Sequence, residues 1–498
     1  YESFSLTSFH QVADEYAAFY IAAGVTEKDP IAVYLEEGVS NYLNLVALTS
    51  LGAIAVLING AMRPEVAAEY MRRVGVVGAF VGEAQHAALA PHQGGLNLRF
   101  VATHRSASAT PPGKLPAPYV HADDDACMLC HSSGTTGAPK PVIEQHGQFF
   151  EGTRLRLASG MLDSTERVLS TLPHSHSAGV SLFMSCVLNG APILLASDYH
   201  ASRVLPLIAS FEPTSVVGFT RTMVELASAD LSGAKLDSVR LWVNSGDAAH
   251  EKHIRLLVQH GHRIKDGARM PGSTFLDGFG STEMSFALFQ RFFTKETTDY
   301  GRSLGKPLPI AEAVVLAEDG SALPPDQPGL LGVRAPSITR GYWNESQLTY
   351  RSRKRGYWLT GDIVMRDGEG NFYHLDRITD VIRSNAGPIF TLPIEERLLQ
   401  FHDDILDAAV FGVRGGDGDT RPMGVVLLKA SSEWTEQALH EAFNRELDTL
   451  GLARVVRLAI AHPSDPWPVG PTGKVIKHAL RDQFSAAAPA TTPGAPPR

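Results

Sequence analysis

Small hydroxyl residues and glycines gather with a lysine at residues 132–140, in the run SSGTTGAPK. Glycines let backbone N–H groups approach an anion closely, hydroxyl groups add donors, and Lys140 adds a positive charge. The glycine-to-lysine spacing and the proline before the lysine distinguish the run from a Walker loop. We predict a phosphate-binding loop here. A plain surface turn is the alternative, because clusters of Gly, Ser and Thr are usually loops.

Just before this loop, residues 127–131 read C-x-x-C-H, which is the pattern of c-type haem attachment and offers an alternative function for this segment. Haem attachment requires an exposed segment in an exported protein. Here Cys127 and Cys130 flank apolar residues that predict a buried strand over 126–129. We therefore expect both thiols to be packing residues.

Three later segments carry groups that suit a nucleotide. Residues 277–283 (DGFGSTE) place glycines around an aromatic ring that can stack on a base, with Thr282 available to a phosphate and Glu283 to Mg²⁺. Asp362 follows a glycine turn and can accept two ribose hydroxyls. Lys474 stands on the Gly/Pro-rich loop PVGPTGK. Taken singly, each has an ordinary alternative: a loop, a helix cap or solvated aspartate, and a solvated lysine.

The elements around these segments alternate between strands and helices, which is typical of parallel sheets covered by helices. A helix is expected over 8–21 and another over 41–51. Near residue 300 a Gly/Pro-rich texture predicts a small β subdomain, and a compact αβ pattern follows the polar residues 377–380. The expected strands before residue 300 are 31–35, 52–57, 76–81, 99–102, 167–171, 192–195, 215–218 and 239–243.

Length, charge and composition predict the number of domains and exclude some classes of protein. With 498 residues the chain exceeds one ordinary domain. We predict an α/β protein with an N-terminal domain over 1–376, an α+β C-terminal domain over 377–484 and a disordered tail over 485–498. The diffuse net charge of −9 argues against nucleic acid as a partner. No apolar run reaches the ~20 residues of a membrane span. Three cysteines and no recognisable signal peptide predict a cytoplasmic protein.

In their order and separations, the four segments resemble the adenylate-forming superfamily, and specifically its acyl-CoA synthetase branch. Connecting segments at 303–307, 341–344 and 410–413 match as well, so the resemblance runs from about residue 9 to residue 480. It implies an active site between a large N-terminal portion and a mobile C-terminal domain. It also implies ATP, Mg²⁺ and CoA as cofactors and a small carboxylic acid as substrate.

The resemblance assigns roles residue by residue. The phosphate loop is Ser132, Ser133, Gly134, Thr135, Thr136, Gly137 and Lys140. The other nucleotide-binding residues are Gly246, Asp247, Ala248, Asp277, Gly278, Phe279, Gly280, Ser281, Asp362 and Arg377. The catalytic residues are Lys474, Thr282, His176 and Glu283, the last also as metal ligand. The acyl pocket is His174, Phe219, Thr220, Arg221, Ser245 and Gly246, the CoA tunnel is Ala386 and Gly387, and the hinge is Thr379.

The implied reaction has two steps. A carboxylate attacks the α-phosphate of ATP, pyrophosphate leaves, and the acyl group of acyl-AMP then passes to CoA. Two anions must meet in the first step, so we expect Lys474 to place positive charge between them and Mg²⁺ to shield the phosphates. In the family the C-terminal domain then rotates, Lys474 withdraws, and the loop after Arg377 forms the thiol tunnel.

Several residues depart from the family pattern. Thr379 replaces the usual Asp or Lys of the hinge (where Asp380 is a substitute), Ala386 replaces a tunnel glycine, and Thr391 replaces a proline. These departures leave open a ligase that mainly transfers a preformed acyl-adenylate. A stand-alone adenylating enzyme serving a carrier protein, a non-catalytic relative and a homodimer are further alternatives. Intact Lys474 argues against the non-catalytic one.

The acid itself is less defined. His176 stands where peptide-synthetase domains place an aspartate for the α-amine, which disfavours α-amino acids. We expect His176 to gate the acyl pocket, with a packing histidine as the alternative. Arg221 either meets a second polar group of the acid or is solvent-exposed.

Overall fold

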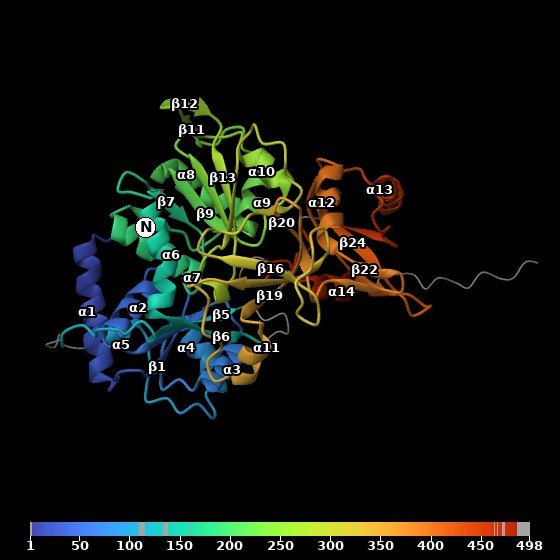
Figure 1. The fold of residues 1–498 in the computed structure, drawn as a ribbon. Coiled ribbons are helices and arrows are strands. Elements are labelled where there is room, and N and C mark those ends of the chain that lie inside the picture. The colour runs from blue at the N-terminus through green and yellow to red at the C-terminus, as the bar shows by residue number, and fades with distance from the viewer. Residues whose placement is uncertain are drawn as a thin grey trace, which may run out of the picture.

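Two six-stranded sheets with helices between their strands form most of the first 293 residues, and smaller sheets follow (Figure 1). The α/β fold class predicted from the sequence is confirmed. The computed structural model describes residues 2–108, 115–132, 138–160, 162–462, 464–465, 467–470 and 474–485. The predicted tail lies, apart from residue 485, outside the described residues.

The first sheet has the strand order β4-β3-β1-β2-β5-β6, with β6 antiparallel to β5 and the other pairs parallel. Continuous apolar runs such as IAVLI bury its central strands on both faces. The strands are β1 (Pro30–Leu35), β2 (Ile54–Asn59), β3 (Gly78–Val81), β4 (Val101–Ala102), β5 (Ala126–Ser132) and β6 (Lys140–Gln145). The helices of this part are α1 (Leu6–Ala22), α2 (Ser40–Ser50), α3 (Pro64–Val74), α4 (Glu83–Leu89), α5 (His104–Ser108) and α6 (His146–Ser159).

The second sheet has the order β14-β13-β10-β9-β7-β8, with β14 antiparallel to β13. Its strands are β7 (Val168–Ser170), β8 (Ile193–Leu195), β9 (Ser215–Phe219), β10 (Leu241–Gly246), β13 (Thr274–Phe279) and β14 (Phe289–Phe293). The helices are α7 (Ser177–Asn189), α8 (Ala201–Phe211), α9 (Thr220–Ser228) and α10 (Glu251–Leu257), and a hairpin of β11 (His262–Lys265) and β12 (Ala268–Pro271) extends from it.

The carboxyl ends of the two sheets face each other. The backbone N–H of His174, which follows β7, donates to the Glu37 carboxylate, which follows β1, at 2.6 Å. Ligands of open parallel sheets bind at the carboxyl ends of the strands. The two sheets therefore bring their functional ends to one region.

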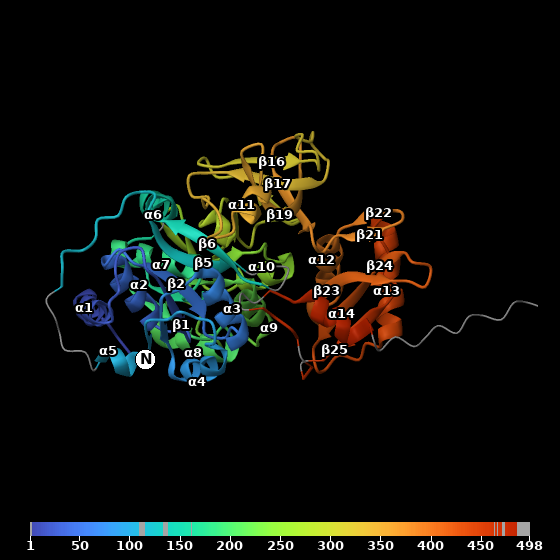
Figure 2. The same cartoon turned by 90° about the horizontal axis from the view of Figure 1, so that it is seen from below.

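The antiparallel sheet that follows has the order β15-β20-β19-β17-β16 and forms a separate layer (Figure 2). Its strands are β15 (Ser303–Gly305), β16 (Glu312–Leu316), β17 (Gly329–Arg334), β18 (Arg353–Lys354), β19 (Tyr357–Arg366) and β20 (Phe372–Arg377), with helix α11 (Ser346–Arg351) beside them. This sheet is the small β subdomain that the Gly/Pro-rich texture predicts.

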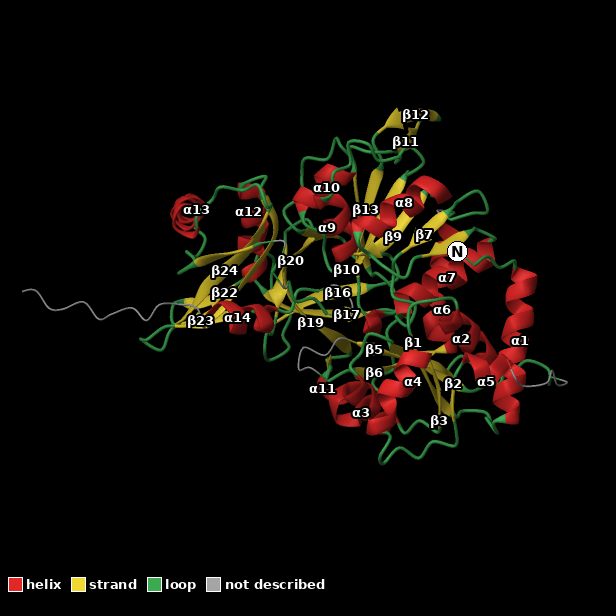
Figure 3. Ribbon diagram, turned by 180° about the vertical axis from the view of Figure 1, so that it is seen from behind, coloured by secondary structure: helices red, strands yellow, loops and turns green. Residues whose placement is uncertain are grey.

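The C-terminal elements lie to one side of the other sheets (Figure 3). A hairpin of β21 (Ile382–Ser384) and β22 (Gly387–Ile389) precedes a three-stranded sheet of β23 (Ile405–Arg414), β24 (Thr420–Leu428) and β25 (Leu458–Ala461). Its helices are α12 (Thr391–Phe401), α13 (Glu436–Leu450) and α14 (Lys477–Ser485).

The structure bears directly on the two cysteines of the C-x-x-C-H pattern and on membrane-spanning helices. Cys127 is 9% and Cys130 0% exposed, and burial raises the pKa of the Cys127 thiol to about 12. Both are therefore packing residues, as expected. Across the described residues, no helix combines the length and apolar character that crossing a membrane requires.

Candidate active site between the two portions of the chain

A buried ion pair joins two neighbouring strands of the β subdomain. Asp362 on β19 and Arg377 at the end of β20 are direct cross-strand partners, and Arg377 Nη1 donates to Asp362 Oδ1 at 2.8 Å. Burial alone would raise the pKa of Asp362, but Arg377, together with His374 and Lys474, outweighs burial and holds that pKa below its ordinary value. Asp362 therefore stays an anionic hydrogen-bond acceptor, as recognition of hydroxyl groups requires.

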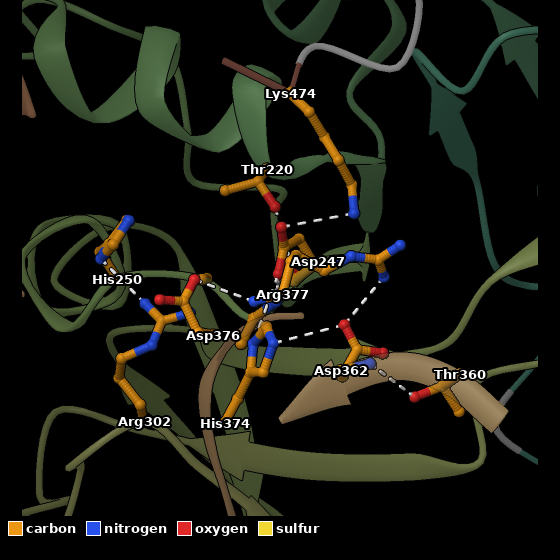
Figure 4. A network of polar contacts seen from close by, with 12 residues as sticks. Thr220, Asp247, His250, Arg302, Thr360, Asp362, His374, Asp376, Arg377 and Lys474 are labelled. Atoms are coloured by element: carbon orange, nitrogen blue, oxygen red, sulfur yellow. Dashed lines mark hydrogen bonds and ion pairs between the residues drawn. The ribbon is translucent and has the colours of Figure 1, made fainter. Parts of the chain in front are cut away.

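His374 is the main site residue that sequence reasoning missed. It lies on β20, and its ring nitrogens are 3.5 Å from Asp362 Oδ1 and 3.7 Å from Asp247 Oδ1 (Figure 4). Neither nitrogen makes a well-aligned hydrogen bond, although the side chain is 1% exposed. The available signal was the alternation along β20, which points every second side chain inward and puts this histidine in an inward position.

Lys474 meets the N-terminal portion at Asp247. Its Nζ lies 3.4 Å from Asp247 Oδ2. Burial would raise the pKa of Asp247, but Lys474 leads a set of positive neighbours that lowers it. The aspartate follows β10, and Thr220 Oγ1 donates to its carbonyl at 3.2 Å. Residues more than two hundred positions apart in the chain thus meet beside the Asp362–Arg377 pair (Figure 4).

The turn that carries Asp247 is held from the next strand. Asn244 Nδ2 donates to the Asp247 carbonyl and to Asp277 Oδ1, both at 2.6 Å. The backbone N–H of Ala249 donates to the other oxygen of the Asp277 carboxylate at 3.1 Å. The Asp277 carboxylate is therefore committed to positioning this turn, and burial raises its pKa to about 6.

His176 joins the start of α7 to the segment after β13. Its Nδ1 accepts from the backbone N–H of Ala178, so the ring proton sits on Nε2, which lies 3.2 Å from Thr282 Oγ1. Burial lowers the pKa of His176 to about 3, so the ring is neutral. Phe219 packs edge-on against it at 5.0 Å between centroids.

Glu283 lies one residue beyond Thr282, in the short helix Thr282–Met284. Its Oε1 accepts from the Tyr342 hydroxyl at 2.9 Å, and the Lys140 ammonium lies 5.6 Å from the centre of the same tyrosine ring. No group of three or more candidate metal ligands occurs within the described ranges. A single carboxylate fits Mg²⁺ that arrives on phosphates, because that ion keeps waters and needs one or two protein carboxylates.

The phosphate loop is described at its two ends. Ser132 and Lys140 are register partners at the ends of β5 and β6. Lys140 lies beside the Tyr342–Glu283 contact, because its ammonium is close to the Tyr342 ring. Five residues of the predicted cradle lie outside the described residues: Ser133, Gly134, Thr135, Thr136 and Gly137.

The remaining predicted nucleotide residues cluster at the ends of β10 and β13. These strands are paired in register from Leu241 to Gly246. Gly246 has φ +98, a conformation that favours glycine. Phe279 is buried and meets the His374 ring edge-on at 5.2 Å. The others at these strand ends are Ser245, Ala248, Gly278, Gly280 and Ser281.

Arg221 does not project toward the reacting groups. Its guanidinium pairs with Glu225 on its own helix and, at 3.1 Å, with Asp407 on β23. The same carboxylate accepts from Trp467 Nε1 at 2.9 Å. The expectation of a solvent-exposed arginine is therefore wrong, because Arg221 joins the two portions of the chain, while the expected substrate contact stays a prediction. His174 is buried, and its backbone N–H donates to the Glu37 carboxylate.

The residues expected in the hinge and the CoA tunnel lie elsewhere. Thr379 is exposed in the turn after β20, while Ala386 is in the turn of the β21–β22 hairpin and Gly387 begins β22. Among the described residues, their polar contacts stay local: Thr379 to Asp380, and Gly387 O to Ser384. This arrangement has Lys474, and not the hairpin, at the nucleotide residues.

Residues 1–343 match the family described as AMP-binding enzyme. The chain belongs to this family. A 3-aminoavenalumate diazotase from Streptomyces sp is 40% identical over 512 residues, covering 97% of this chain and 90% of that protein. 4-Coumarate–CoA ligase 5 from Oryza sativa subsp. japonica is 26% identical over 511 residues, covering 98% and 91%. ATP-bound MatB from Rhodopseudomonas palustris shares the fold, with a TM-score of 0.81 at 19% identity over 97% of this chain and 94% of that chain.

Proposed function

We propose that this protein uses ATP to form the adenylate of a small oxyacid, releases pyrophosphate, and transfers the activated group to a nucleophile. The observation that carries the proposal is the meeting of Lys474, Asp247 and the Asp362–Arg377 pair at one point. Family membership supports ATP as the substrate that this point receives.

The residue roles follow from charge. Asp362 accepts the ribose hydroxyls with Arg377 beside it, and Lys474 offsets the repulsion between the acid and the α-phosphate. Thr282 and His176 bind the α-phosphate and the acid, with His176 donating from Nε2. Glu283 would hold Mg²⁺, which supplies charge shielding on the phosphates.

Two acids fit this chemistry, and the relative at 40% identity favours nitrite. That relative is named 3-aminoavenalumate diazotase. Diazotisation needs a nitrogen at the oxidation level of nitrite. Nitrite oxygen attacks the α-phosphate and pyrophosphate leaves. The amine nitrogen then attacks the nitroso nitrogen, AMP leaves, and the N-nitrosamine takes up a proton and loses water to give the diazonium.

The second candidate is ligation of a carboxylic acid to CoA through acyl-AMP. It is supported by the similarity to 4-coumarate–CoA ligase and by the shared fold. Here the β21–β22 hairpin with Ala386 and Gly387 would have to reach the site after Lys474 withdraws, turning about Thr379. A carrier protein is an alternative acceptor. We propose that either reaction takes place in the cytoplasm. For the oligomeric state of the protein, a homodimer is an alternative to a monomer.

The test is one matrix of reactions with the full chain, ATP and Mg²⁺. One arm contains nitrite with a panel of aromatic amines, and the other contains carboxylic acids with and without CoA. AMP formation that needs both nitrite and amine, with a diazonium trapped by azo coupling, supports the first candidate. AMP formation that needs acid and CoA supports the second. Absence of AMP in both arms contradicts adenylation itself.

A further inference from the structure

One cation in the N-terminal portion has no anionic partner. Arg156 on α6 donates through Nη1 to Ser185 Oγ at 2.8 Å and to both oxygens of Ser181, all of them neutral acceptors on α7. No described residue accepts a hydrogen bond from its Nε or Nη2. Buried arginines are normally paired with carboxylates or phosphates. This guanidinium therefore keeps two donor nitrogens for a partner that the described part of the chain does not supply.

The surroundings of Arg156 are largely dry but not sealed. Burial lowers its pKa to about 10, and no carboxylate counteracts that shift. The side chain nevertheless retains partial solvent exposure. Its guanidinium carbon lies 5.2 Å from the centre of the Phe286 ring, and Phe286 packs against α6 where Gly152 leaves room for it. A cation in such a place binds an anion more strongly than one in water.

The position of Arg156 relates it to the reacting groups. His176 and Thr282 contact each other. Helix α7 begins directly after His176, and a second segment runs from Thr282 to Phe286. Arg156 touches both segments further on, at Ser181 and at Phe286. Ser181 is about 7.5 Å further along the axis of α7 than His176, at about 1.5 Å per residue. This rise between the two backbone positions is comparable to the length of an aromatic ring with its substituents.

We propose that Arg156 binds a carboxylate of an aromatic substrate at the end remote from the reacting nitrogen. This inference rests on the proposed function, because it takes the His176–Thr282 contact as the reacting end. The guanidinium fork would present Nε and Nη2 to the two carboxylate oxygens, the geometry that arginine offers bidentately. The substrate class would then be aminoaryl carboxylates rather than simple aromatic amines.

The test uses pairs of ligands that differ in this carboxylate alone. Meta-aminobenzoate with meta-aminobenzamide, and para-aminocinnamate with para-aminocinnamamide, would be titrated calorimetrically into the full chain, without turnover. We expect at least one carboxylate to bind about 10- to 100-fold tighter than its amide. Arg156→Met should remove this preference while leaving amide binding within about twofold, and Arg156→Lys should retain part of it.

Arg154→Gln is the matched control, since Arg154 lies on the same helix, pairs with Glu151 and is 53% exposed. Its preference should equal that of the wild type, and circular dichroism checks the folding of all variants. Equal affinity for carboxylate and amide, no binding by any carboxylate, or a preference that survives Arg156→Met would each overturn the proposal. Binding through Arg156 without AMP formation would instead contradict the proposed function and leave this site standing.

Discussion

The two sides of the nucleotide site are built in different ways. Asp362 and Arg377 face each other through the register of neighbouring strands, and the aspartate side chain is 3% exposed. Lys474 comes from the C-terminal portion, its side chain is 42% exposed, and its contact with Asp247 is a longer 3.4 Å. One side is therefore fixed by local folding, whereas the other is delivered by docking of the C-terminal elements, and we propose that it can be withdrawn.

The docking itself rests on polar contacts around that delivered side. Arg221 and Trp467 share the Asp407 carboxylate, and Trp467 lies seven residues before Lys474 in the same connecting segment. Glu396 on α12 accepts from His250 and Arg302 of the N-terminal portion. These contacts hold the C-terminal elements against the site. Changes on the two sides should therefore have separable consequences.

Removing the delivered charge should have the largest effect. Lys474→Ala should slow adenylation by about 10²- to 10³-fold, the usual cost of losing one transition-state charge contact. Transfer from a chemically synthesised adenylate should change by less than about threefold. The measurements are acid-dependent ATP–pyrophosphate exchange and single-turnover transfer. Lys429→Ala, at an exposed lysine of the C-terminal portion, is the control, and equal loss of both steps in Lys474→Ala would contradict separate delivery.

Breaking the fixed side should cost stability as well as nucleotide binding. Arg377→Met leaves Asp362 buried without its partner, so we expect a loss of 2–4 kcal/mol in the free energy of unfolding, with ~3–5 kcal/mol typical of fully buried pairs. The partial exposure of Arg377, 30%, reduces the cost. Affinity for ATP should fall in parallel, as measured by denaturant titration and calorimetry.

The pH dependence of this stability loss has a defined sign. Arg377 lowers the folded-state pKa of Asp362, so its contribution is present above the ordinary value of 3.8 and is lost as pH falls. The gap between wild type and Arg377→Met should therefore be widest near pH 7 and narrow on acidification. Arg366→Met on the same sheet is the control. A gap that grows toward low pH would exclude this ion pair as its cause.

Loosening the docking contact should have a smaller effect. Arg221→Met removes the ion pair with Asp407 between the N-terminal and C-terminal portions but no nucleotide contact. The adenylation rate should therefore fall by about 3- to 10-fold, and the transfer rate should not fall. A double-mutant cycle with Asp407→Asn should show coupling, because the two side chains contact each other. If Arg221 instead bound the substrate, its loss would raise the KM for the acid in adenylation and the KM for the adenylate in transfer.

The smallest effect concerns His176. Burial keeps its pKa near 3, so the ring remains neutral between pH 5 and 8. The ratio of adenylation rates for wild type and His176→Asn should therefore change by less than about twofold over that range. Other groups that titrate near pH 6, such as Asp277, cancel in the ratio. A ratio that changes about tenfold around pH 6.5 would show that His176 ionises during catalysis.

The sequence was most informative where function and fold rest on local order. Alternating strands and helices predicted the two parallel sheets, and the texture near residue 300 predicted the antiparallel one. The sequence singles out Asp362 because it follows a glycine and Lys474 because it lies in a Gly/Pro-rich segment. Cys127 and Cys130 were correctly taken as packing residues because their neighbours are apolar.

Tertiary contacts explain what the sequence could not give. The alternation along β20 marks His374 as an inward residue but does not place it beside Asp247, and no local spacing marks Asp407 as the partner of Arg221. The sequence offers a substrate contact or solvent exposure for Arg221, and it does not indicate the ion pair with Asp407. Thr391, a departure from the family proline, donates to the Asp376 carboxylate through both its N–H (2.6 Å) and its hydroxyl (3.0 Å). Proline could make neither bond.

The central claim is that an acid attacks the α-phosphate of ATP, and isotope transfer tests it most directly. The acid that supports AMP formation, nitrite or a carboxylate, would be labelled with oxygen-18 and the AMP analysed by mass spectrometry. The account predicts one labelled oxygen in each AMP formed, together with equimolar pyrophosphate. Unlabelled AMP, or ADP and phosphate as products, would contradict it.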